Sequence, residues 1–175
     1  MTTAYQTEID WTHGHDGKLL TPTLRMARPQ VDPAPQAGRL TTREQILNFV
    51  LAGNATFTIR NARTGNRFTY KVRQPKKDAP HFVGLLAGPD NEADYQFLGS
   101  IFDGVRYCHG RRSAVSPSAQ SAMAFAAFWG LVVSDRLPAN LEVWHEGSCG
   151  KCGRKLTVPE SIEAGLGPEC ARRGM

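Results

Sequence analysis

Three of the four cysteines in this chain lie near its carboxyl end, at spacings that suit the binding of one metal ion. Cys149 and Cys152 form a C-x2-C pair, in which a tight turn directs both sulfurs at the same point. Cys170 follows Pro168 in Gly-Pro-Glu-Cys, so we expect it in the first turn of a short helix. His145 completes the pattern H-x3-C-x2-C-x17-C. These side chains predict a tetrahedral zinc site in a treble-clef or ribbon-like, zinc-finger-type module.

Alternatives remain open for this segment. The thiols could form a disulfide or be unrelated buried side chains. A disulfide needs an oxidising compartment, however, and the first residues are polar, unlike a signal peptide. The fourth ligand could instead be Cys108 or His109, although chelation by His145 closes a smaller loop. A catalytic zinc keeps an open position beside an acid or base, and Glu146 alone is adjacent, so we expect a structural ion.

A run of basic residues is the second chemical signal. Between positions 60 and 77 the chain carries seven basic residues and no acid: Arg60, Arg63, Arg67, Lys71, Arg73, Lys76 and Lys77. Because side chains alternate along a strand, Arg67, Lys71 and Arg73 are expected on the face opposite Tyr70. Such a stripe can follow a phosphate backbone and displace its counterions. The alternative is a solvated sheet face whose charges keep the protein soluble.

Composition describes a globular chain. The 175 residues are 41% hydrophobic and 21% charged, which suits one ordinary domain with a small metal module. The longest apolar stretch, 122–133, is too short to cross a bilayer and suits a buried helix. A net charge of +5 favours a polyanionic partner. We therefore expect a cytoplasmic protein with no membrane partner.

Three parts are predicted along the chain: an irregular proline-rich arm at 1–40, an α+β body at 41–140 and a zinc-binding module at 141–175. In the body, Thr42 to Gln45 reads as a capping box that begins a short helix. A β-hairpin follows, with a loop at 61–66, and further strands are expected at 81–86, 95–102, 105–108 and 141–144. Ser116-Pro117 should begin a long helix, apolar nearly all round, that crosses the sheet. The fold class is thus an antiparallel sheet packed on one long apolar helix, with the C-terminal zinc module.

Motifs of catalysis are missing from the sequence. It contains no Walker loop and no G-x-S-x-G turn. Cys108 and His109 are neighbours, which on a strand point to opposite faces and cannot form a nucleophile–base pair. We do not expect an enzyme.

The C-terminal segment has the pattern C-x2-C-G-R-x-L-T-x-P-x-S followed by G-x-G-P-x-C, from Cys149 to Cys170. It resembles an uncharacterised family of small bacteriophage and prophage proteins. The stretches 55–73 and 87–91 are similar to longer members, so the resemblance covers 41–175. It implies a zinc site, a phage origin and hence a location in the host cytoplasm, but no activity.

The leading functional hypothesis is non-enzymatic nucleic-acid binding through the basic hairpin, largely without sequence preference. In the alternative, the protein inhibits a host protein complex, for example as an anti-defence factor, and its basic surface occupies a site for nucleic acid. A third hypothesis is a structural component of the virion. Small phage proteins that carry a metal are often nucleic-acid accessories or inhibitors of host machinery, so the first two hypotheses have the support of analogy.

Overall fold

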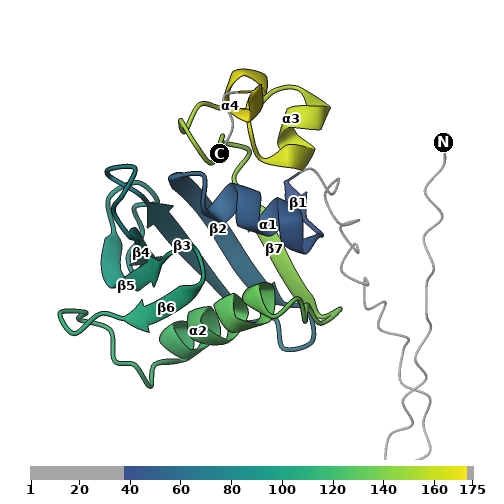
Figure 1. Cartoon of the computed structure of the whole chain (residues 1–175). Helices are drawn as coiled ribbons and strands as arrows, with labels where there is room; N and C mark the ends of the chain where they lie inside the picture. Colours follow the sequence, from purple (N-terminus) through teal and green to yellow (C-terminus); the bar gives the residue numbers. More distant parts are fainter. Residues whose placement is uncertain (1–37, 173–175) are drawn as a thin grey trace, which may run out of the picture. The chain divides into compact units, whose positions relative to one another are not determined.

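A computed structural model describes residues 38–172 (Figure 1), and most of the predicted arm, residues 1–37, lies outside the described part. The elements follow in the order β1 (Arg39–Leu40), α1 (Arg43–Val50), β2 (Asn54–Asn61), β3 (Arg67–Arg73), β4 (His81–Leu86), β5 (Tyr95–Phe102), β6 (Arg106–His109), α2 (Gln120–Val133), β7 (Leu141–His145), α3 (Pro159–Ala164) and α4 (Pro168–Arg172). The strands of this described part form one seven-stranded antiparallel sheet in the order β1-β7-β2-β3-β4-β5-β6. The α+β class with an antiparallel sheet is confirmed.

Helix α1 begins as its sequence predicts. The Thr42 hydroxyl accepts a hydrogen bond from the backbone N–H of Gln45, and the Gln45 side chain accepts one from the Thr42 N–H. This reciprocal capping box satisfies N–H groups that a helix start leaves without partners. Helix α1 then buries Ile46, Phe49 and Val50 against the sheet.

Helix α2 begins later than predicted and is not buried all round. The Ser116 hydroxyl accepts a hydrogen bond from the N–H of Ser118 and forms a second hydrogen bond with the Ser118 hydroxyl. These two bonds hold a turn before the helix. The helix starts only at Gln120, after Ala119, without a capping side chain. One side is buried (Ala122, Phe125, Phe128, Trp129 and Val132), whereas Met123 on the other side is 52% exposed. The helix therefore packs on the sheet by one face.

Helices α1 and α2 cover the same face of the sheet. The inward ring of Phe57 on β2 lies 6.4 Å from the ring of Phe49 in α1 and 5.8 Å from that of Phe128 in α2. The two helices are joined where Nε of Arg43 donates to the main-chain oxygen of Val132 at 2.9 Å. Side chains on the other face, such as Arg67, Arg73 and Phe82, are exposed. We call this second side the open face.

Strand β7 belongs to the sheet, although the predicted boundary placed it with the metal module. Its residues pair with β2 on one side, as in Arg60 opposite Glu142, and with β1 on the other. Leu40, which the predicted arm included, is buried in the core opposite Val143. None of the four helices in the described part of the chain has the length and apolar character that a bilayer crossing requires.

Candidate metal centre

A tight turn after β7 brings two cysteines together. The Cys149 N–H donates to the oxygen of Arg154, and the Gly153 N–H donates to the oxygen of Cys149, both at 2.8 Å. An isolated bridge between Ser148 and Lys155 closes the base of the turn. These bonds fix the backbone on both sides of Cys152, so the C-x2-C pair forms the predicted knuckle.

Two short helices bring the third cysteine to the knuckle. Helix α3 has Pro159 in its first turn and ends at Gly165, whose φ of 67° is left-handed. A glycine adopts this conformation at little cost, so it suits the end of a helix. Helix α4 then begins at Pro168 and carries Cys170 in its first turn, as predicted from the sequence.

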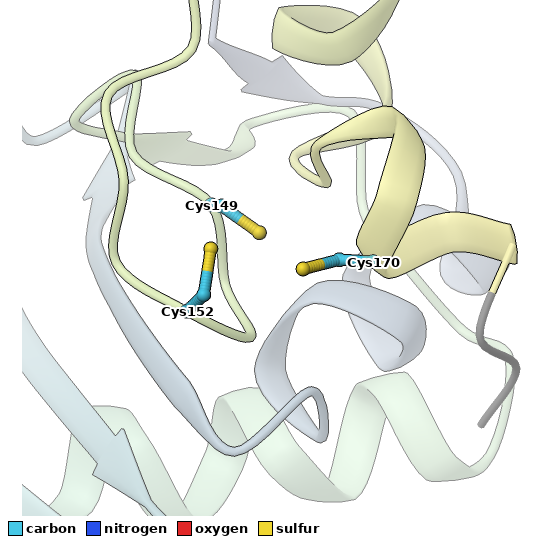
Figure 2. Close-up of side chains that lie close together, drawn as sticks. All are labelled: Cys149, Cys152 and Cys170. Carbon is cyan, nitrogen blue, oxygen red and sulfur yellow. The ribbon is translucent and has the colours of Figure 1, made fainter.

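The three thiols converge on one point (Figure 2). The sulfurs of Cys149, Cys152 and Cys170 all lie within 4.8 Å of one another, and no disulfide joins them. An ion that bonds each sulfur at about 2.3 Å in tetrahedral geometry would separate the sulfurs by about 3.8 Å. Small side-chain movements therefore suffice, and the cluster fits one metal ion. Cys149 is buried, Cys170 is half-buried and Cys152 is exposed.

The pKa values of two of these thiols are shifted in opposite directions. Burial raises the pKa of Cys149, but N–H groups of Gly167, Cys152 and Lys151 outweigh it and lower this pKa to about 7. The pKa of Cys170 rises to about 11, through burial and its interactions with the other two thiols. Two negative charges at this distance repel each other, which opposes a second ionisation. A cation between the sulfurs would remove that repulsion, so the donor set suits a metal.

The structure does not bring His145 to the thiols, contrary to the prediction that it is the fourth ligand. Its Nε2 lies 2.6 Å from the main-chain oxygen of Ile162, and its Nδ1 accepts from the Gly147 N–H at 3.1 Å. Both ring nitrogens are thus engaged by the main chain. Among the described residues, the ligand cluster contains only the three cysteines.

The two alternative ligands also lie elsewhere. Cys108 and His109 are on β6, at the edge of the sheet opposite the β1–β7 edge. Cys108 is exposed there, and Nε2 of His109 lies 3.1 Å from the oxygen of Val115.

Phe49 joins the metal module to the body, a role that sequence reasoning missed. Its buried ring lies 5.0 Å from the ring of His145. A Cβ atom at Gly150 would lie 2.8 Å from the Phe49 oxygen, and one at Gly165 would overlap its ring. The Gly150 oxygen also accepts a 2.6 Å hydrogen bond from the N–H of Asn54, at the start of β2. In the sequence, the only sign of this contact is the pair of glycines at 150 and 165, because the absence of a Cβ atom there lets the module approach Phe49 closely.

The basic residues lie where the strand pattern predicts. Arg67 and Arg73 are exposed and Lys71 is half-buried on the open face of β3, whereas Tyr70 and Val72 are buried on the other. Three further members lie in the loops at the two ends of β3. Arg63 is exposed in the turn before β3, and Lys76 and Lys77 are exposed in the loop after it.

Glu142 on β7 partly neutralises the positive charge of the basic residues. A carboxylate oxygen of Glu142 lies 3.5 Å from Arg60, and the other lies 3.9 Å from Arg39. The sequence between 60 and 77 contains no acid, so this pairing appears only once β7 is placed beside β2. The row Arg67, Lys71 and Arg73 is therefore the stronger part of the positive surface.

Comparison with known proteins identifies a relative of the C-terminal part. Residues 139–173 match the Family of unknown function (DUF6011). The matched stretch spans β7, the knuckle and both short helices, including Cys149, Cys152 and Cys170. It fits the predicted resemblance to an uncharacterised family. No curated protein and no solved structure matches the chain.

Proposed function

We propose that this protein is a non-enzymatic nucleic-acid-binding protein that carries a structural zinc ion. The observation that supports binding is the row of Arg67, Lys71 and Arg73 on the open face of β3. Strand geometry spaces successive side chains of one face by about 6.8 Å. Lys71 and Arg73 are thus about 6.8 Å apart, and Arg67 lies about twice as far from Lys71 because Thr69 stands between them. Each strand of a duplex carries one phosphate per about 3.4 Å of axis, so the row can reach several phosphates of one strand.

Interactions of this kind carry little sequence information. Lysine and arginine recognise phosphate oxygens, which are the same for every base, and the affinity comes from the release of condensed counterions. We therefore propose binding largely without sequence preference. Lys71 is held in place on this surface, because its ammonium nitrogen lies 4.9 Å from the ring centroid of Tyr95.

Zinc is the metal that we propose for the thiol cluster. Thiolate sulfur is a soft ligand that suits zinc, and a C-x2-C knuckle with a cysteine on a following helix is a common zinc-binding order. A structural role is supported by the packing of this module against Phe49, because the ion would hold the knuckle and helix α4 together in that position. Protein purified without added metal should contain about one zinc per chain.

We also propose a phage or prophage origin and a location in the host cytoplasm. The origin is supported by the resemblance of the motif from Cys149 to Cys170, and the location by the use of free thiols as ligands, which a reducing compartment preserves.

The direct test is a titration of labelled DNA and RNA with the protein at increasing salt. Arg67→Glu should weaken binding and make the log–log salt slope shallower by roughly 0.7 to 0.9 for each phosphate that the variant no longer neutralises. The matched control is Arg136→Glu, which makes the same change of charge at an exposed residue after α2. If both variants weaken binding equally, only the net charge matters. If the unaltered protein binds no nucleic acid at low salt, the proposal fails, and the hypotheses of a host inhibitor or a virion component should be tested instead.

A further inference from the structure

Two phenylalanine rings lie exposed on the open face of the sheet, beside the basic row. Phe82 on β4 is 40% exposed and Phe97 on β5 is 39% exposed. Their ring centroids are 6.2 Å apart with planes at 61°, so an edge of one ring meets the face of the other. A pair of phenylalanine rings is an apolar surface, which a globular protein normally buries.

The local backbone holds this pair outward. A β-bulge between Val83 and Gly84 shifts the register, so Gly84 lies opposite Phe97 while Leu98 is buried in the core. A Cβ atom at Gly110 would overlap the ring of Phe97, so the absence of a side chain at 110 leaves room for that ring. The rings are thus packed against the sheet on one side and open to solvent on the other.

Three arginines lie near the pair, although the loop that joins β4 to β5 is acidic. Arg73, at the end of the basic row, lies directly opposite Phe82 in the β3–β4 ladder. Arg111 and Arg112 directly follow Gly110 and are exposed. Apolar rings flanked by cations complement a ligand that has flat apolar faces and a polyanionic backbone, which describes a nucleic acid with unpaired bases.

We infer that the open face binds single-stranded nucleic acid, with bases stacked on Phe82 and Phe97 and phosphates along Arg67, Lys71 and Arg73. This inference rests on the proposed nucleic-acid binding and defines its substrate class. Duplex bases are stacked within their helix and cannot lie on rings fixed in a sheet, whereas every unpaired base offers a free face. Stacking also tolerates any base, consistent with binding that ignores sequence.

The test compares a fluorescein-labelled oligothymidine of about 20 nucleotides with the same strand annealed to its complement. Fluorescence anisotropy at about 50 mM salt should show tighter binding of the single strand. Phe82→Ala and Phe97→Ala should each weaken single-strand binding by about fivefold or more and leave duplex binding nearly unchanged. Met123→Ala is the control, because it removes an exposed apolar side chain from α2 on the other side of the sheet.

Further variants separate stacking from loss of fold. Phe82→Tyr keeps a ring and should retain the affinity, whereas Phe82→Leu keeps the apolar bulk but should lose it. Phe97→Trp should gain emission that oligothymidine quenches and the duplex does not. Circular dichroism of each variant checks that the sheet is intact.

The possible outcomes separate this inference from the proposed function. Equal binding of single strand and duplex, unaffected by the two alanine variants but weakened by Arg67→Glu, would overturn the stacking inference and leave the proposed function standing. Loss of affinity in Phe82→Leu with retention in Phe82→Tyr would support stacking. Absence of binding to both probes would overturn both proposals, and the exposed rings would then be a surface for a protein partner.

Discussion

The Nε2 atom of His145 donates a 2.6 Å hydrogen bond to the main-chain oxygen of Ile162, which joins the last residue of β7 to helix α3. Because Nδ1 accepts from the Gly147 N–H, the neutral ring satisfies both bonds with its proton on Nε2. Burial lowers the pKa of His145 and favours this neutral form. The residue thus positions the metal module against the sheet.

Replacing His145 should therefore affect stability more than metal content. We expect His145→Gln to keep about one metal ion per chain and to lose roughly 1 to 3 kcal/mol of unfolding free energy, the usual cost of a broken buried hydrogen bond. Elemental analysis and urea unfolding measure the two effects. Cys152→Ser is the control that should lose the ion. If His145→Gln loses it as completely, the histidine is a ligand after all.

A second buried histidine makes stability depend on pH. Nε2 of His81 lies 3.1 Å from the oxygen of Leu51, and burial lowers its pKa from the ordinary value of 6.5. Below pH 6.5 the unfolded chain binds a proton that the folded chain resists. Above pH 6.5, His81 should therefore not change the free energy of unfolding. Below that pH, the free energy of unfolding should fall as the pH decreases.

The contribution of His81 can be isolated by difference. The stability advantage of the unaltered protein over His81→Gln should shrink as the pH falls from about 7.5 to about 5.5, because glutamine does not titrate. Urea unfolding at several pH values measures it, and protonation of the thiols cancels in the difference. A constant advantage across this range would mean that His81 has the same pKa in the folded and the unfolded chain.

Glycine substitutions test the packing between Phe49 and the metal module. Gly150→Ala would place a Cβ atom 2.8 Å from the Phe49 oxygen, a backbone atom that cannot move alone. We expect a loss of about 1 to 3 kcal/mol of unfolding free energy from this overpacking. Gly130→Ala is the matched control, because nothing lies within 4 Å of its Cβ position in α2. It should stabilise the protein by up to about 1 kcal/mol through helix propensity.

Local patterns predicted most of the fold correctly. The capping box of Thr42 and Gln45 and the alternation of Tyr70 and Lys71 depend on residues close in sequence, so they can be recognised without a structure. The same holds for strands β4 and β5 and for the cysteine knuckle. The prediction for the start of α2 was wrong because the hydroxyl of Ser116 forms hydrogen bonds within its own turn instead of capping the helix.

Relations between distant segments could not be predicted. Arg60 meets Glu142 only because β7 returns beside β2, and His145 meets Ile162 only because α3 folds back on the sheet. A histidine four positions before a C-x2-C pair has the spacing of a ligand, and the sequence does not reveal a competing carbonyl. The exposure of Phe82 could not be predicted either, because a strand pattern does not say which face of the sheet the helices leave uncovered.

Removal of the metal should separate the module from the sheet after β7. The knuckle and helices α3 and α4 bury little beyond Cys149 and Leu156, whereas β7 is held between β1 and β2. Chelation should therefore expose residues 146–172 to protease and leave a resistant fragment that ends near His145. Mass spectrometry of the digest locates the cut. A fragment that ends before Leu141 would show that β7 leaves the sheet with the module.

Charge reversal at Arg67 should stabilise the fold even as it weakens nucleic-acid binding. Arg67 lies directly opposite Arg60 in the β2–β3 ladder, and like charges in this position repel. Arg67→Glu turns the repulsion into attraction, and we expect a gain of roughly 0.2 to 1 kcal/mol in unfolding free energy at low salt. Arg73→Glu is the control, because Arg73 lies opposite the uncharged Asn54 and should change stability little. The gain should shrink at about 1 M salt, where screening is strong. If Arg67→Glu is instead less stable than Arg73→Glu, the stem of Arg67 packs on the sheet in a way that outweighs its charge.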